Sequence, residues 1–284
     1  PWSYADFTIA SQPIFGMTNR RARAEEGIEI MNAKEIILEA GTILKKRYYE
    51  KQNYSVKERF HLLSQVDIEM DKFISKRLTE SFPTCSVYSE ESETIVNGED
   101  ARWILDPIDG TTNFIMGNPF FAISVALVSD GEITEGHVYN PISDEYFFAA
   151  MATDHAYLND ERISTAQTAH LPEALIAFGY SAKMEVIEAY YSVWKKVFTE
   201  CRKGIGWVAP ALSICNVARG RIDAFIDTGC STQGQAAASL ILKKASGKMF
   251  DNAFREYDYR SKGAIFCSVA IEGALRNAFT KSEL

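Results

Sequence analysis

The feature that most constrains this chain is a short apolar strand that runs directly into two aspartates. Trp103-Ile104-Leu105 is followed by Asp106-Pro107-Ile108-Asp109-Gly110. Proline has no backbone N–H to give to a sheet ladder, and glycine permits a tight turn. The strand is therefore expected to stop at Asp106, with both carboxylates converging on one point.

Two carboxylates at such a turn repel each other unless a divalent cation or a basic partner compensates them. Hard oxygen ligands of this kind suit Mg²⁺ rather than zinc. The segment is not an EF-hand loop, because the alternating acidic spacing and the distal glutamate are missing. On spacing alone, the alternative is an aspartate-rich turn that caps a helix.

Composition narrows the class of protein. The chain has 284 residues, of which 46% are hydrophobic, so it can bury a large core as one domain or two fused layers. Its 30 basic residues against 38 acidic ones give a net charge of −8, which argues against a nucleic-acid or anionic membrane surface. No apolar run approaches the ~20 residues of a membrane span. Five scattered cysteines without a C-x-x-C pair predict reduced thiols in a cytoplasmic protein.

Periodicity predicts helices first, then an antiparallel meander of strands, then mixed helices and strands, which together favour an α/β-layered domain. The first helix is expected to begin near Glu35, with Asn32 as its N-cap, and Asp130-Gly131 is a hairpin signal. The other predicted elements are helices over 67–81, 186–197, 211–218 and 236–245, and strands over 85–88, 120–128, 135–139, 145–150 and 221–227.

The residues from Trp103 to Phe114 resemble the signature of the inositol monophosphatase family. Further segments also resemble it, so that the likeness runs from about Met31 to the C-terminus: Gln65-Val66-Asp67, Ser89-Glu90-Glu91-Ser92, Gly136 to Pro141 and Asp258 to Gly263. The continuation Thr111-Thr112-Asn113 is closest to the inositol and fructose bisphosphate phosphatase branches. No Walker A loop, His-Glu-x-x-His, G-x-S-x-G or dinucleotide fingerprint competes with this interpretation.

The resemblance implies a five-layered α-β-α-β-α sandwich of the inositol monophosphatase and fructose-1,6-bisphosphatase type. It implies Mg²⁺-dependent hydrolysis of a small phosphate monoester, such as inositol monophosphate or a related sugar or polyol phosphate, by a metal-activated water. Two or three Mg²⁺ ions, inhibition by Li⁺ and a homodimer are implied as well. On this basis residues 31–284 form the family domain, with a metal-binding half over 31–150 and a substrate-binding half over 151–284. Residues 1–30 are then an N-terminal extension or a remnant of cloning.

The resemblance also assigns roles to individual residues. The implied metal ligands are Glu90, Asp106, the Ile108 carbonyl and Asp109. The implied catalytic residues are Asp67, Glu90 and Thr111, of which Asp67 and Thr111 position the attacking water. The implied substrate-binding residues are Asp109, Asp227 and the Gly110 and Thr111 amides, which cradle the phosphate.

The second half of the chain departs from the family pattern. Gln233-Gly234 stands where the family has a Trp-Asp pair whose aspartate completes the second metal site, and the neutral amide of Gln235 is a weaker replacement. Trp207 and Pro210 make the usual Gly-Ser/Thr-Ala stretch bulkier and less polar. The alternative hypothesis is therefore a catalytically impaired relative that binds metal or a phosphorylated ligand without efficient turnover.

Overall fold

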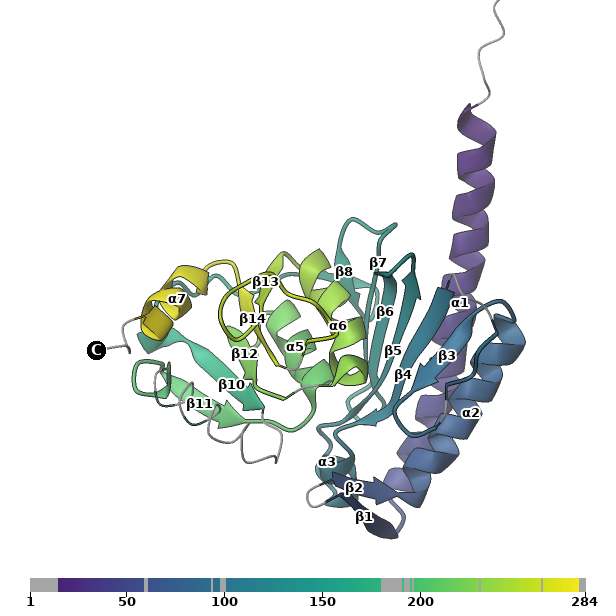
Figure 1. Ribbon diagram of the computed structural model, residues 1–284, viewed down its shortest axis with the longest axis horizontal. Coiled ribbons are helices and arrows are strands. Elements are labelled where there is room, and N and C mark those ends of the chain that lie inside the picture. The colour runs from purple at the N-terminus through teal and green to yellow at the C-terminus, as the bar shows by residue number, and fades with distance from the viewer. Residues whose placement is uncertain are drawn as a thin grey trace, which may run out of the picture.

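The computed structural model describes residues 15–58, 61–92, 94–97, 101–179, 191, 195, 197–229, 231–261 and 263–280. Two sheets alternate with three helical layers in Figure 1. The predicted five-layered sandwich is therefore confirmed. The helix expected over 186–197 falls largely outside the described residues.

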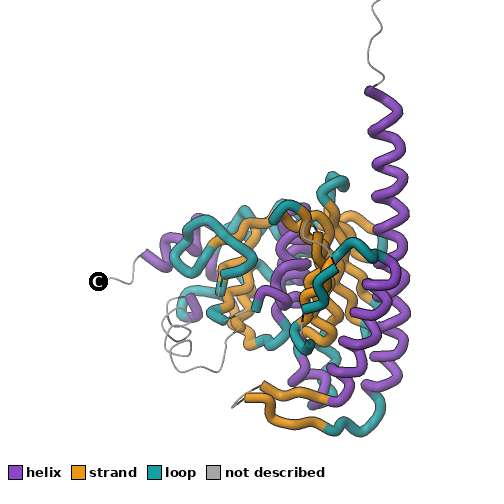
Figure 2. Tube along the Cα trace, turned by 45° about the vertical axis from the view of Figure 1, so that its right-hand side comes forward, coloured by secondary structure: helices purple, strands orange, loops and turns teal. Residues whose placement is uncertain are grey.

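The first sheet has seven strands in sequential order, from β3 to β9. The helices α1 and α2 lie side by side on its outer face (Figures 1 and 2). These elements are α1 (Phe15–Tyr48), α2 (Gln65–Ser81), β3 (Ser86–Ser89), β4 (Ala101–Asp109), β5 (Ala122–Ser129), β6 (Glu132–Asn140), β7 (Glu145–Ala150), β8 (Ala156–Leu158) and β9 (Glu161–Ile163). A hairpin of β1 (Tyr54–Glu58) and β2 (His61–Ser64) joins the two helices, and α3 (Thr111–Ile115) follows β4.

The second sheet has five strands in the order β11-β10-β12-β14-β13. The helices α5 and α6 separate the two sheets, and α7 packs on the far side of the second one (Figure 1). These elements are η1 (Leu171–Glu173), β10 (Leu175–Gly179), β11 (Lys203–Gly206), α5 (Pro210–Ala218), β12 (Ala224–Asp227), α6 (Thr232–Lys244), β13 (Gly247–Phe250), β14 (Ala264–Ser268) and α7 (Glu272–Thr280).

Two sequence predictions about element ends are wrong. The first helix begins at Phe15, so Asn32 lies inside it and is not its N-cap. The early part of α1 projects beyond the sheet in both views (Figures 1 and 2), where a helix needs no apolar stripe, and its Arg, Ala and Glu residues favour helix without one. The strand β4 continues past Asp106 to Asp109, although its pairing with β5 shifts register between those two residues.

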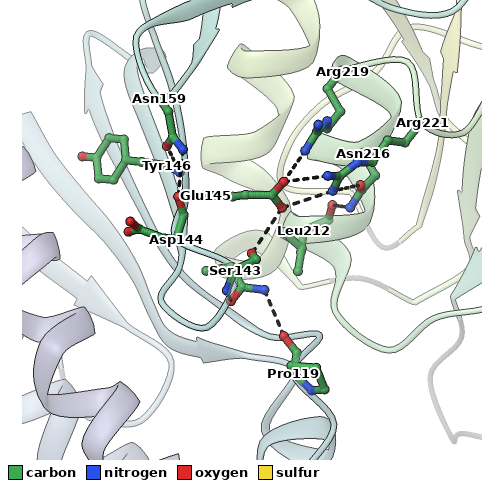
Figure 3. A network of polar contacts seen from close by, with 11 residues as sticks. Pro119, Ser143, Asp144, Glu145, Tyr146, Asn159, Leu212, Asn216, Arg219 and Arg221 are labelled. Atoms are coloured by element: carbon green, nitrogen blue, oxygen red, sulfur yellow. Dashed lines mark hydrogen bonds and ion pairs between the residues drawn. The ribbon is translucent and has the colours of Figure 1, made fainter.

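Glu145 links the first sheet to the middle helical layer (Figure 3). Its carboxylate accepts hydrogen bonds from Arg219, from Arg221 at 2.7 Å and from the Ser143 hydroxyl at 3.2 Å. Arg221 also reaches Asn216 on α5 at 3.3 Å. Burial alone raises the pKa of Glu145, but Arg221 and Arg219 lower it below its ordinary value. The network therefore fixes α5, whose other end lies at the candidate site.

Glu145→Gln is expected to lower the free energy of unfolding by about 1–2 kcal/mol at pH 7, because it leaves two arginines without their counter-charge. A carboxyl group with a lowered pKa stabilises the fold above its unfolded value of about 4.3, and this contribution disappears as the pH falls through the folded value. The difference from wild type should therefore narrow in acid. Urea denaturation checks this, with Glu80→Gln in the exposed Lys76–Glu80 pair as the control. Equal losses for both variants would contradict the assignment.

Candidate active site

The two aspartates of the signature strand are buried together at the end of β4. Asp106 is 6% exposed and Asp109 is 2% exposed. The Ile108 backbone N–H donates to Asp106 Oδ1 at 3.1 Å, which holds the turn between them. The two carboxylates are close enough for the charge of Asp109 to raise the pKa of Asp106, and the strand between them shifts its register with β5 rather than ending.

Glu90 joins this pair from the end of the neighbouring strand. Its backbone N–H donates to the Leu105 carbonyl at 3.2 Å, and its side chain shares a hydrogen bond with Asp106. The preceding residue, Ser89, donates its hydroxyl to Asp71 on α2. The parallel pairing of β3 with β4 thus brings Glu90 to Asp106.

Burial and neighbouring negative charge raise the pKa of Asp106 and of Asp109. Burial raises the pKa of Asp106 well above its ordinary value, and the negative charges of Glu90 and Asp109 raise it further. Burial also raises the pKa of Asp109, to about 8, although the N–H groups of Leu212 and Ala211 oppose the shift. A cluster of carboxylates that disfavour one another's charge is stabilised by a cation.

Asp67 and Thr111 meet beside this cluster. The Thr111 hydroxyl lies 2.8 Å from Asp67 Oδ1 and 3.1 Å from the Ile108 carbonyl oxygen. The other carboxylate oxygen of Asp67 accepts the backbone N–H of Ser64 at 2.9 Å, in a capping box that starts α2. Burial raises the pKa of Asp67 despite these hydrogen bonds. Sequence reasoning missed Ser64, although its place three residues before Asp67 is the signal of a capping box.

A side chain at Gly110 would be strained and crowded. The φ of this residue is +92°, in the left-handed region. A Cβ there would lie 3.0 Å from Ala209 Cβ, 3.1 Å from the Val208 carbonyl oxygen and 3.2 Å from the Phe120 carbonyl oxygen. The glycine thus lets the signature turn pack against the 207–210 segment.

The backbone of α5 holds Asp109 in place. Leu212 N–H donates to Asp109 Oδ2 at 3.2 Å, and Ala211 N–H also hydrogen-bonds to this carboxylate. The methyl group of Ala209, the N-cap residue of α5, cannot accept a hydrogen bond from these amides. Asp109, which is distant in sequence, accepts them instead. Sequence reasoning missed this role because backbone donors leave no mark on residue identity.

Asp227, the predicted substrate-binding acid, lies at the end of β12. It is buried, accepts the Gly229 N–H at 2.7 Å and raises the pKa of Asp109 by its charge. A Cβ on Gly179, its partner on β10, would lie 2.4 Å from Asp227 Oδ2. Asp227 is therefore an acid of the second sheet that lies close to the acidic cluster of the first sheet.

The first turn of α6 carries the departure from the family pattern. A Cβ on Gly234 would lie 3.5 Å from Asp109 Oδ1, so this position faces the acidic cluster without a side chain. The neighbouring Gln235 has partners outside the cluster. Its amide oxygen accepts the Tyr257 hydroxyl at 3.1 Å, and its NH₂ donates to the Ser261 carbonyl at 2.8 Å. That its amide oxygen also serves the cluster stays a prediction.

The donor set is of the oxygen kind that Mg²⁺ prefers. Glu90 and Asp106 share a hydrogen bond and so offer hard carboxylate oxygens side by side, whereas Asp109 faces Gly234, which carries no carboxylate. Over the described ranges, no three His, Cys, Asp or Glu side chains are already arranged as a metal centre.

Comparison with known proteins identifies the class to which this fold and site belong. The model of the inositol monophosphatase family matches residues 28–282. The chain belongs to this family and is a phosphoric monoester hydrolase. No helix in the described part of the chain meets the length and hydropathy needed to cross a membrane.

Individual relatives agree with the family match. An inositol-1-monophosphatase from Rhizobium meliloti is 34% identical over 75% of this chain and 81% of its own length. Inositol monophosphatase 2 from Solanum lycopersicum is 29% identical over 91% of this chain and all of its own. The crystal structure of extragenic suppressor protein suhB from Bartonella henselae superimposes with a TM-score of 0.84 at 32% identity, covering 89% of this chain and 99% of that one.

Proposed function

We propose that this chain hydrolyses a small phosphate monoester, inositol monophosphate or a related sugar or polyol phosphate, with Mg²⁺ bound at Glu90, Asp106 and the Ile108 carbonyl. The observation that carries the proposal is the buried cluster in which Glu90 and Asp109 both raise the pKa of Asp106. Names of relatives support the substrate class, among them a fructose-1,6-bisphosphatase/inositol-1-monophosphatase from Aquifex aeolicus that is 33% identical.

The chain's own residues divide the work of phosphoryl transfer, which depends mainly on positioning and on charge neutralisation. The Thr111 hydroxyl orients the attacking water. Asp67, whose carboxylate lies 2.8 Å from that hydroxyl, accepts the hydroxyl proton as the hydroxyl takes a proton from the water. The Gly110 and Thr111 amides receive the phosphate, and Asp227 binds hydroxyl groups of the substrate. Mg²⁺, when bound, neutralises phosphate charge and lowers the pKa of water.

A second candidate function is binding of metal or a phosphorylated ligand with little turnover. It is favoured by Gly234, which adds no carboxylate on the Oδ1 side of Asp109, and by the hydrogen bonds of Gln235 to Tyr257 and Ser261. On this proposal the first metal position survives and the second is weak. The rate of hydrolysis is then lower, because the transition state lacks the electrostatic stabilisation that the second ion would add.

The remaining features implied by the resemblance are part of the proposal. They are a homodimer, a cytoplasmic location, more than one Mg²⁺ ion during turnover, inhibition by Li⁺ and no nucleic-acid partner. A relative from Pasteurella multocida, 28% identical, bears the name Nus factor SuhB. Light scattering therefore tests for the homodimer, and a gel-shift assay tests for binding to RNA. Binding to RNA would contradict the expectation of no nucleic-acid partner.

The test is phosphate release from inositol 1-phosphate, fructose 1,6-bisphosphate and 3′-phosphoadenosine phosphate, each with Mg²⁺ and with EDTA. Mg²⁺-dependent release from any of them is the expected result and names the substrate branch. Folded protein that releases no phosphate even at high Mg²⁺ would favour the second candidate function.

A further inference from the structure

Two aromatic side chains lie together next to the segment that packs against Gly110. The ring centroids of Phe120 and Trp207 are 4.5 Å apart, with the ring planes tilted by 39°. Both rings are half-buried and pack against the core between the two sheets. Core packing on one side and partial exposure on the other make the pair a fixed apolar surface.

Hydrogen bonds tie this surface to the signature turn. Asn113 Nδ2 donates to the Phe120 carbonyl at 2.7 Å and to the Val208 carbonyl at 3.4 Å. The same two carbonyl oxygens lie 3.2 and 3.1 Å from the Cβ position of Gly110. Trp207 N–H donates to the Phe178 carbonyl at 3.0 Å, which fixes the segment to the second sheet. The aromatic pair is therefore held within a residue or two of the backbone that receives the phosphate.

The wall next to Gly110 offers little to a hydroxylated ligand. Apart from the indole N–H, the side chains of Trp207-Val208-Ala209-Pro210 have no hydrogen-bonding group, and Val208 is 42% exposed. A polyol placed against this wall loses water from its hydroxyls without gaining partners. A planar aromatic ring loses no hydrogen bonds there and gains contact with Trp207.

We propose that the preferred substrate of this site carries a planar aromatic group on its leaving alcohol, which packs against Trp207 and Phe120. The inference rests on the proposed function and adds to it that the leaving alcohol lies on the 207–210 side of Gly110. It narrows the substrate class to a phosphate monoester of an aromatic-bearing alcohol or sugar.

Two matched ligands test the inference without requiring turnover. Calorimetry in Mg²⁺ compares 2-phenylethylphosphonate with 2-cyclohexylethylphosphonate, which differ in the planarity of the ring and cannot be hydrolysed. The phenyl compound is expected to bind roughly fivefold to tenfold more tightly to the wild type. Equal affinities, or tighter binding of the cyclohexyl compound, would overturn the inference.

Variants of Trp207 test whether this residue causes the preference for the phenyl compound. Trp207→Leu keeps an apolar side chain and is expected to bring the affinity ratio close to one, whereas Trp207→Phe retains most of it. A ratio that persists in Trp207→Leu would place the aromatic contact elsewhere and refute the assignment. Thermal melting checks that each variant folds. If Trp207→Leu does not fold, the comparison of the two ligands on the wild type still tests the inference. Phosphate release from 2-phenylethyl phosphate, measured separately, tests the proposed function and not the ring preference.

Discussion

Asp106→Asn is expected to lower Mg²⁺-dependent phosphate release by about 1,000-fold or more, the scale of losing a central electrostatic group in an active site. Asp106 is buried, hydrogen-bonds to Glu90 and lies beside Asp109, so it is the acid that the other two share. Asparagine keeps the shape of the side chain and removes the charge that holds the cation. Steady-state rates at saturating Mg²⁺ check this prediction.

The matched control is Asp160→Asn. Asp160 is an exposed aspartate whose contact is a surface pair with Lys34 at 3.0 Å, and its φ of +66° is one that asparagine tolerates. Its activity should stay within about twofold of wild type, as surface pairs contribute little. If Asp106→Asn kept more than a tenth of the wild-type rate, the proposed metal position would be wrong.

Asp106→Asn should also melt at a higher temperature than the metal-free wild type. The substitution removes a buried acid whose charge Glu90 and Asp109 oppose. About 1 kcal/mol of relief would raise the melting temperature by about 2–4 °C in a chain of this size. Calorimetry in EDTA measures the melting temperatures of the variant and the wild type. If the variant melted at the lower temperature, its lost activity would be explained by a destabilised fold.

The second large effect is expected from Gly234→Asp. The new carboxylate would start from a Cβ 3.5 Å from Asp109 Oδ1. The other neighbours of this Cβ, at 3.3 and 3.6 Å, are side-chain atoms, so the Cβ fits without displacing backbone. It would add an anionic oxygen to the weak side of the cluster. The Mg²⁺ concentration for half-maximal rate should fall at least about tenfold, and the maximal rate should rise.

Gly234→Ala separates the charge from the packing. It places the same Cβ in the first turn of α6 and should stabilise the helix by about 0.5–1 kcal/mol, because glycine is a poor helix former. Its Mg²⁺ dependence should match wild type. If alanine and aspartate shifted the Mg²⁺ dependence equally, the proposal of a weakened second metal position would fail.

Local sequence predicted the parts of the site that lie close together in the chain. The spacing of Asp106 and Asp109 around Pro107 predicted that they lie close together, and the helix expected over 67–81 ends where α2 ends, at Ser81. The five layers followed from the family resemblance, whereas periodicity alone predicted only a layered α/β domain. These signals succeed because capping, proline and glycine act within a few residues.

Contacts across long sequence separations were not predictable in the same way. Asp109 is held by the Leu212 amide, 103 positions away, and a backbone donor has no residue signature. The hydrogen bonds of the Gln235 amide to Tyr257 and Ser261 likewise join residues 22 and 26 positions apart. The early start of α1 was missed because its projecting part lacks the apolar period on which helix prediction depends.

The most direct test of the central claim is the initial rate of phosphate release by the wild-type chain as a function of Mg²⁺, on whichever substrate of the panel it hydrolyses best. A cluster in which Glu90 and Asp106 hold one ion well and Asp109 faces Gly234 predicts no release in EDTA and half-saturation in the millimolar range or above. Release that persists in EDTA would contradict the metal-dependent assignment, and saturation at micromolar Mg²⁺ would contradict the weakened second position.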